Sequence, residues 1–217
     1  NSFRDMNVLN YEKAVEWLVG EGYAVVRLGD RTMTPLNLKG PGIFDAPFHP
    51  GYEPFWDVYF SGICAFMISC HSGPCMLPRG FGRPLLAVNA MLHFSHVPGA
   101  MEVCAYKHHV RIQDGKRLDY QAILEAGVPD FAAAAGYEKA GIDLLELSPD
   151  ELLEATREMV DLVRSGADPD NEANREYRRL NLLEHQKRIG DPAYFADVAD
   201  YFGSAVPTTH ISKVFWN

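Results

Sequence analysis

Apolar and polar positions along the chain predict strands alternating with helices. Residues 66–70 (FMISC) and 84–88 (PLLAV) form two apolar runs of strand length. Short apolar runs without alternation are typical of strands covered on both faces, as in a parallel sheet. The sequence between them, HSGPCMLPRGFG, predicts a tight turn followed by a short helix. We therefore expect a strand–helix–strand unit at the centre of the fold.

The same patterning extends this unit in both directions. Apolar residues at helical spacing predict a helix over 11–21, and the run YAVVRL predicts a buried strand over 23–28. Ser148, Pro149 and Glu151 form a strong helix start signal. Further elements are expected as follows: an edge strand at 42–45, a strand at 106–112, and helices at 56–65, 119–126, 131–140, 148–164 and 175–188.

Together these elements predict an α/β fold with a Rossmann-like parallel sheet and helices on both faces. A polar break near residue 166 divides the chain into a Rossmann-like domain over 1–165 and a helical extension over 166–217 that packs on it. The last helix has a basic face, which predicts a solvated surface, with contact to an anionic membrane or an acidic partner as the alternative.

Composition narrows the class of protein. The 217 residues are 47% hydrophobic, enough for a sizeable core, and the net charge of −9 argues against a nucleic-acid partner. No apolar run is long enough to span a bilayer. The four cysteines fit no secreted disulfide framework, so reduced thiols and a cytoplasmic location are expected. Because the first residue is Asn, we expect a fragment, a processed form or an ordered remnant of a longer chain.

The turn His71-Ser72-Gly73-Pro74 is the first candidate site. It follows the carboxyl end of a predicted strand, where open α/β sheets bind ligands. Gly73 permits close approach of the backbone, and a helix that begins at Pro74 directs free N–H groups toward an anion such as a diphosphate. The Ser72 hydroxyl adds a donor. The alternative is an ordinary strand-to-helix turn without a ligand.

Arg27 is the second candidate, because an arginine in an apolar strand should not be buried without a partner. Near the strand's carboxyl end it could bind a phosphate or a carboxylate. A structural ion pair is the alternative, with three possible partners: Asp30, Asp45 and Asp57.

Several histidines and a cysteine raise the question of zinc. They are His93, His96, Cys104, His108 and His109. Their spacing matches no paired-ligand pattern, so we predict no metal site and expect these histidines to be exposed or hydrogen-bonded.

Four stretches of the chain resemble the C-terminal half of a bacterial family of glycosyltransferases linked to surface-carbohydrate synthesis. They are FRDMNVLNYEKAVEWLVGEGYAVVRLGD, DVYFSGICAFMISCHSGPCMLPRGFGRPLLAVN, GKRLDYQAILEAG and LSPDELLEATREMVD, and the resemblance covers most of residues 3–190. The family looks like metal-independent GT-B glycosyltransferases, whose C-terminal domain holds the sugar nucleotide. The positions that match its motifs are Arg4, Asn10, Tyr11, Arg27, Gly29, Ser72, Gly73, Pro84 and Asn89.

This resemblance implies an enzyme that moves a sugar from a nucleotide-sugar to a carbohydrate or glycolipid acceptor, without a further cofactor. It implies catalytic roles for Arg27 and His71 and donor binding by Gly29, Ser72, Gly73 and Asn89, although His71 departs from the small or polar residue expected there. Arg4 and Asn10 could fix a hinge. A cytoplasmic location is implied, with the periphery of the inner membrane as the alternative.

The chain is shorter than two Rossmann domains, so we expect either that an N-terminal partner domain is missing or that the chain keeps the donor-binding half alone. Two alternatives stay open: a non-catalytic docking domain of a larger assembly, and a hydrolase or epimerase that acts on a nucleotide-sugar. The nucleotide, the sugar, the acceptor and the oligomeric state are not predicted.

Overall fold

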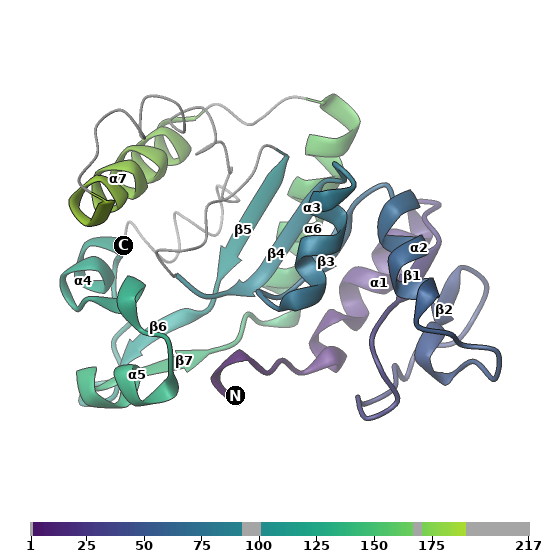
Figure 1. Ribbon diagram of the computed structural model, residues 1–217, viewed down its shortest axis with the longest axis horizontal. Coiled ribbons are helices and arrows are strands. Elements are labelled where there is room, and N and C mark those ends of the chain that lie inside the picture. Colours follow the sequence, from purple (N-terminus) through teal and green to yellow (C-terminus); the bar gives the residue numbers. More distant parts are fainter. Residues whose placement is uncertain (1, 93–100, 167–170, 190–217) are drawn as a thin grey trace.

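A parallel sheet in the order β3–β4–β5 lies at the centre of the computed structural model, which describes residues 2–92, 101–166 and 171–189 (Figure 1). The strands are β3 (Met67–Ser69), β4 (Leu85–Ala90) and β5 (Glu102–Tyr106). All residues of β4 and β5 are buried, whereas those of β3 are half-buried. The prediction of two parallel strands around a turn and a short helix is confirmed.

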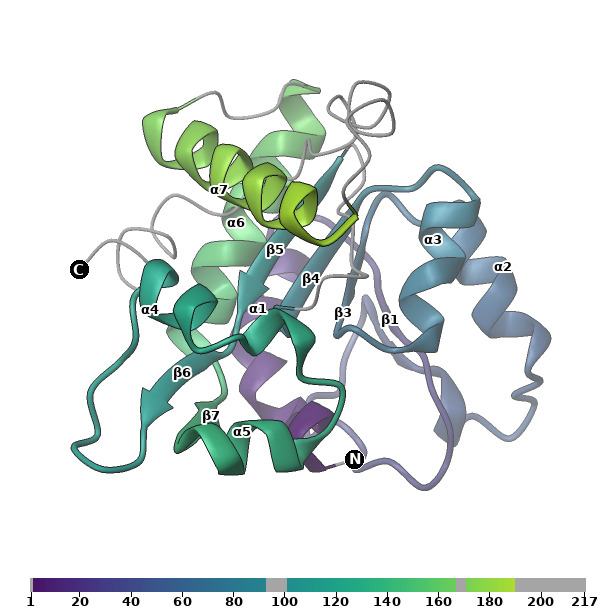
Figure 2. The ribbon, with the colours of Figure 1, turned by 60° about the vertical axis from the view of Figure 1, so that its left-hand side comes forward.

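Helices cover both faces of this sheet, as the sequence predicts. Figure 2 shows α6 (Pro149–Ser165) and α7 (Glu172–Ile189) on opposite sides of β4 and β5. On the α6 side, side chains of the helix pack against Leu86 and Val88 of β4. On the other side, Tyr177 of α7 belongs to the same apolar cluster as Ala87 and Tyr106. The structure is therefore mixed α/β with short parallel sheets.

The start of α6 confirms the predicted helix signal. Ser148 Oγ accepts the N–H of Glu151 at 3.3 Å, and the Glu151 carboxylate accepts the N–H of Ser148 at 2.8 Å. This reciprocal pairing satisfies two N–H groups that a helix otherwise leaves without a partner. The helix then packs along α1 (Glu12–Gly20), whose apolar stripe buries Ala14 and Leu18.

The N-terminal part of the chain forms a separate strand pair. β1 (Val25–Arg27) lies parallel to β2 (Ile43–Asp45), and α2 (Phe55–Ile63) follows. The prediction of a fully buried strand over 23–28 is wrong, since β1 is short and half-buried. Over the described residues the strands form three small sheets rather than one continuous Rossmann sheet.

The region after residue 100 differs most from the predictions. Instead of one strand over 106–112, β5 ends at Tyr106 and β6 (His108–Arg111) pairs antiparallel with β7 (Ile142–Leu145). Buried Glu102 and Lys107 interrupt the apolar pattern, so hydropathy alone does not mark where these strands begin and end. The shorter helices α3 (Met76–Gly80), α4 (Tyr120–Glu125) and α5 (Ala134–Ala140) complete the fold.

The α7 helix packs against the central sheet. Tyr177 is 1% exposed, and its hydroxyl is hydrogen-bonded to that of Tyr106. The rest of the predicted extension, residues 190–217, lies outside the described residues. None of the described helices is both long and apolar enough to cross a membrane. All four cysteines are free thiols.

Candidate functional site

The turn after β3 presents two unused hydrogen-bond donors. The N–H of Ser72 donates to the carbonyl of Cys70 at 2.8 Å, and the N–H of Cys75 donates to the carbonyl of Ser72 at 3.1 Å. Among the described residues, neither the Gly73 N–H nor the Ser72 hydroxyl has a partner. Gly73 is exposed, and a Cβ added there would meet nothing within 4 Å. The turn is therefore open to a ligand.

This turn offers fewer hydrogen-bond donors than the sequence predicts. The turn continues as a 3-10 helix, Gly73–Cys75, and only then as the short helix α3. Pro74 has no N–H, so the turn offers one free amide and one hydroxyl rather than a row of amides. The dipole of so short a helix is also small. An anion that binds at this turn would therefore need hydrogen bonds or positive charge from other groups as well.

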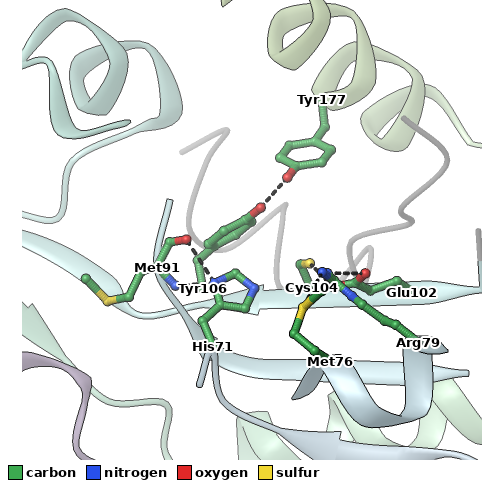
Figure 3. Close-up of polar contacts among 8 residues, drawn as sticks. All are labelled: His71, Met76, Arg79, Met91, Glu102, Cys104, Tyr106 and Tyr177. Carbon is green, nitrogen blue, oxygen red and sulfur yellow. Dashed lines mark hydrogen bonds and ion pairs between the residues drawn. The ribbon is translucent and has the colours of Figure 1, made fainter. Parts of the chain in front are cut away.

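His71 is held firmly beside this turn. Its Nδ1 lies 3.1 Å from the carbonyl oxygen and 3.2 Å from the nitrogen of Met91, which follows β4 (Figure 3). Protonated Nδ1 donates to the carbonyl, whereas unprotonated Nδ1 accepts the N–H of Met91. In both tautomers Met91 fixes the ring, and Figure 3 shows the other nitrogen directed toward Cys104 and Glu102.

A buried ion pair lies next to His71. Arg79 of α3 donates through Nη2 to both carboxylate oxygens of Glu102 at 2.5 Å. Glu102 is 2% exposed, and Cys104 Sγ lies 3.7 Å from its Oε1. Burial raises the pKa of the Cys104 thiol well above its ordinary value, and the Glu102 charge adds to this effect. The thiol is therefore protonated near neutral pH.

The sequence predictions omit both Arg79 and Glu102. A signal existed, because Glu102 begins an otherwise apolar stretch (EVCAY) and a buried carboxylate requires a cation. The two residues are 23 positions apart, and only the fold brings the guanidinium of α3 over the first residue of β5.

Arg27 forms a structural ion pair, one of the alternatives left open by the sequence. Its Nη1 lies 2.6 Å from Asp45 Oδ1 on the neighbouring strand β2. Asp45 Oδ2 also accepts the N–H of Leu36 at 3.0 Å, and the Arg27 guanidinium lies over the ring of Phe48. The described contacts of Arg27 all belong to the β1–β2 region, so its catalytic role stays a prediction.

Gly29 and Asn89 have clear structural roles. Gly29 has φ +131, which disfavours any side chain, and its carbonyl accepts the hydroxyl of Tyr52 at 2.9 Å. Asn89 is 2% exposed at an irregularity of β4 and has φ 48. Its Oδ1 accepts the N–H of Leu147 at 2.7 Å. Of the six predicted site residues, three lie together in one described turn: His71, Ser72 and Gly73.

The remaining histidine candidates separate in the fold. His108 pairs with Glu151 at the start of α6, with Nε2 2.9 Å from Oε1. His109 is buried with its ring 6.2 Å from that of Tyr137. His93 and His96 lie outside the described residues. Comparisons of the chain with protein-family models, curated proteins and solved structures find no significant match.

Proposed function

We propose that this chain binds a nucleotide-sugar at the turn after β3 and takes part in transfer of the sugar to a carbohydrate or glycolipid acceptor. The observation that carries the proposal is the pair of unused donors, the Ser72 hydroxyl and the Gly73 N–H, at an exposed turn beyond the carboxyl end of a parallel strand. Ligands of open α/β sheets bind at this position. The sequence resemblance to GT-B glycosyltransferases supports the same ligand.

In glycosyl transfer, these two donors would stabilise charge that develops on the diphosphate. The bond between the anomeric carbon and the diphosphate breaks, the acceptor oxygen bonds to that carbon, and the acceptor proton passes to a base. Negative charge grows on the diphosphate in the transition state, where fixed donors stabilise it. Ser72 and Gly73 would donate to the diphosphate. His71, fixed by Met91, is the nearest titratable group in the sequence.

The proposal assigns donor binding to this chain and leaves the acceptor site and its base to another part of the enzyme. Over the described residues the turn supplies two donors without a partner, so a second domain that closes over the nucleotide would have to add further contacts. This division agrees with the two-domain enzymes that the sequence resembles.

Thermal unfolding with added nucleotide-sugars tests the proposal. A ligand at 100 times its Kd stabilises the folded state by about 2.7 kcal/mol, which raises the Tm of a chain of this size by roughly 5 to 10 °C. We expect such a shift with one of UDP-, GDP- or CMP-sugars, and a much smaller shift in Ser72→Ala. Thr34→Ala, which removes an exposed hydroxyl elsewhere, is the matched control. No shift with any of the three classes would overturn donor binding by this chain.

A second candidate, docking in a larger assembly, has one observation in its favour. Several large apolar side chains of α2 and of the region around α3 are exposed: Phe55, Val58, Tyr59, Ile63, Met76 and Phe81. Exposed apolar side chains that cluster on one surface commonly mark an interaction site. In a complementation assay, docking predicts loss of function in Phe55→Ser with Ile63→Ser and full function in Ser72→Ala. Enzymatic donor binding predicts that Ser72→Ala loses function.

A further inference from the structure

Three side chains of different metal-ligand types meet above the central sheet, on its α3 side. They are His71, Glu102 and Cys104, and their ligand atoms all lie within 4.8 Å of one another (Figure 3). Glu102 and Cys104 are almost fully buried on one face of β5, and His71 follows β3. Ala87 of β4 pairs with Cys104 in the parallel sheet and belongs to the same buried cluster.

We propose that His71, Glu102 and Cys104 bind a divalent transition-metal ion of the zinc type. Imidazole and thiolate ligands select such ions over magnesium or calcium. In a tetrahedral zinc site the metal–ligand lengths place sulfur and oxygen about 3.5 Å apart. Cys104 Sγ and Glu102 Oε1 are already 3.7 Å apart, so little movement is needed to bring both onto one ion. Three protein ligands is also the number found in catalytic zinc sites.

The surrounding contacts are those that orient metal ligands in proteins. A histidine that binds a metal usually donates its other N–H to a carbonyl, and a ligating carboxylate is itself hydrogen-bonded. His71 Nδ1 lies 3.1 Å from the Met91 carbonyl oxygen, which fits the tautomer whose Nε2 lone pair faces the cluster. Arg79 donates to both Glu102 oxygens from one nitrogen, which supplies the hydrogen bond expected of a ligating carboxylate.

The competing interpretation is a hydrogen-bonded network without an ion. In that case His71 Nδ1 accepts the Met91 N–H, Nε2 carries the proton, and the Arg79 guanidinium balances the Glu102 charge. The two interpretations differ in whether the chain takes up one metal ion through the Cys104 sulfur, and a titration with a spectroscopically active metal distinguishes them.

Titration with cobalt(II) chloride, after dialysis of the full chain against a chelator, tests the site. We expect one equivalent to bind with a thiolate-to-cobalt charge-transfer band, which Cys104→Ser and Cys104→Ala both lose. Glu102→Gln and His71→Asn should weaken binding at least tenfold. Cys75→Ser, which removes a buried thiol outside the cluster, should keep the band. Circular dichroism establishes that each variant is folded.

Absence of the band in the folded wild-type chain would overturn the metal site, as would a band that persists without Cys104. The inference goes beyond the proposed function and can fail separately from it, because the nucleotide-sugar experiment can be carried out on chelator-treated protein. A Tm shift with a donor and no cobalt band would retain the first proposal and reject the second.

Discussion

The side-chain oxygen of Asn89 accepts the backbone N–H of Leu147 at 2.7 Å, a buried hydrogen bond between residues 58 positions apart. This bond joins the end of β4 to the segment that enters α6. The positive φ of Asn89, 48°, turns its amide toward this partner. Asparagine tolerates this conformation better than most residues with a side chain. The residue therefore fixes how the sheet meets the helix that covers it.

Asn89→Ala should destabilise the fold. It leaves the Leu147 N–H buried without an acceptor, which costs about 1 to 3 kcal/mol, and the less tolerated conformation adds to this. Urea denaturation measures the change, with Asn37→Ala, an exposed asparagine, as the control. Unchanged stability together with lost nucleotide-sugar binding would instead support the ligand role predicted from the sequence.

Gly73→Ala should weaken donor binding without destabilising the fold. The added Cβ meets nothing within 4 Å, so the free energy of unfolding should change by less than about 0.5 kcal/mol. The methyl group would, however, hinder close approach of a phosphate to the backbone N–H. We expect donor affinity to fall at least tenfold by calorimetry.

Gly80→Ala is the matched control for this variant, because its Cβ also meets open space but lies at the far end of α3. Equal donor affinity in Gly73→Ala and wild type would exclude the turn as the diphosphate site.

The Arg27–Asp45 pair should contribute to stability as a unit. Arg27→Met leaves Asp45 largely buried without its cation, and breaking such a pair costs about 3 kcal/mol or more. The double variant Arg27→Met with Asp45→Asn should be less destabilised than the sum of the single variants. A double-mutant cycle by denaturation measures this coupling. Additive effects would show that the pair contributes no interaction energy.

Stability should fall as the pH drops below about 6.5. Burial lowers the pKa of His109 to about 4, from 6.5 in the unfolded chain. Between these two pKa values, His109 binds a proton in the unfolded chain but not in the folded protein. The contribution of this residue is therefore complete above pH 6.5 and declines by roughly 1.4 kcal/mol per pH unit down to about pH 4.

His109→Leu should flatten this dependence, since it removes the titrating group from its place beside Tyr137 and His108. His49→Gln, at an exposed position, should retain it. The quantity to compare is the difference in unfolding free energy between pH 7 and pH 5. An identical pH profile in wild type and His109→Leu would contradict the assignment.

Local signals in the sequence were sufficient for much of the fold. The Ser148–Glu151 capping box lies within four consecutive residues, and the apolar runs of β3 and β4 need no distant information. The Arg79–Glu102 pair and the Asn89–Leu147 bond depend on which residues the fold brings together. Hydropathy also places the strand boundaries in the region 101–111 wrongly, because Lys107 is charged and yet buried. Its ammonium donates to the carbonyls of Phe3 and Asp5, which are far away in the sequence.

The candidate site was predictable to a similar degree. The sequence predicts the turn at residues 71–73, which is a local feature. It predicts more backbone hydrogen-bond donors than the turn has, because Pro74 lacks an N–H. Arg27 was recognised as a buried cation, and the sequence left its partner open among three carboxylates. Only the parallel pairing of Arg27 with Asp45 decides between them.

Tyr177 has a consequence for how the chain can be shortened. Its ring lies against those of Tyr106 and Tyr120 in the largest apolar cluster, so α7 closes one side of the central sheet. A protein cut after Ser165 would expose two tyrosines that are now shielded from water. Such a truncation should aggregate, and protein that ends at Ser165 would be poor material for either binding experiment.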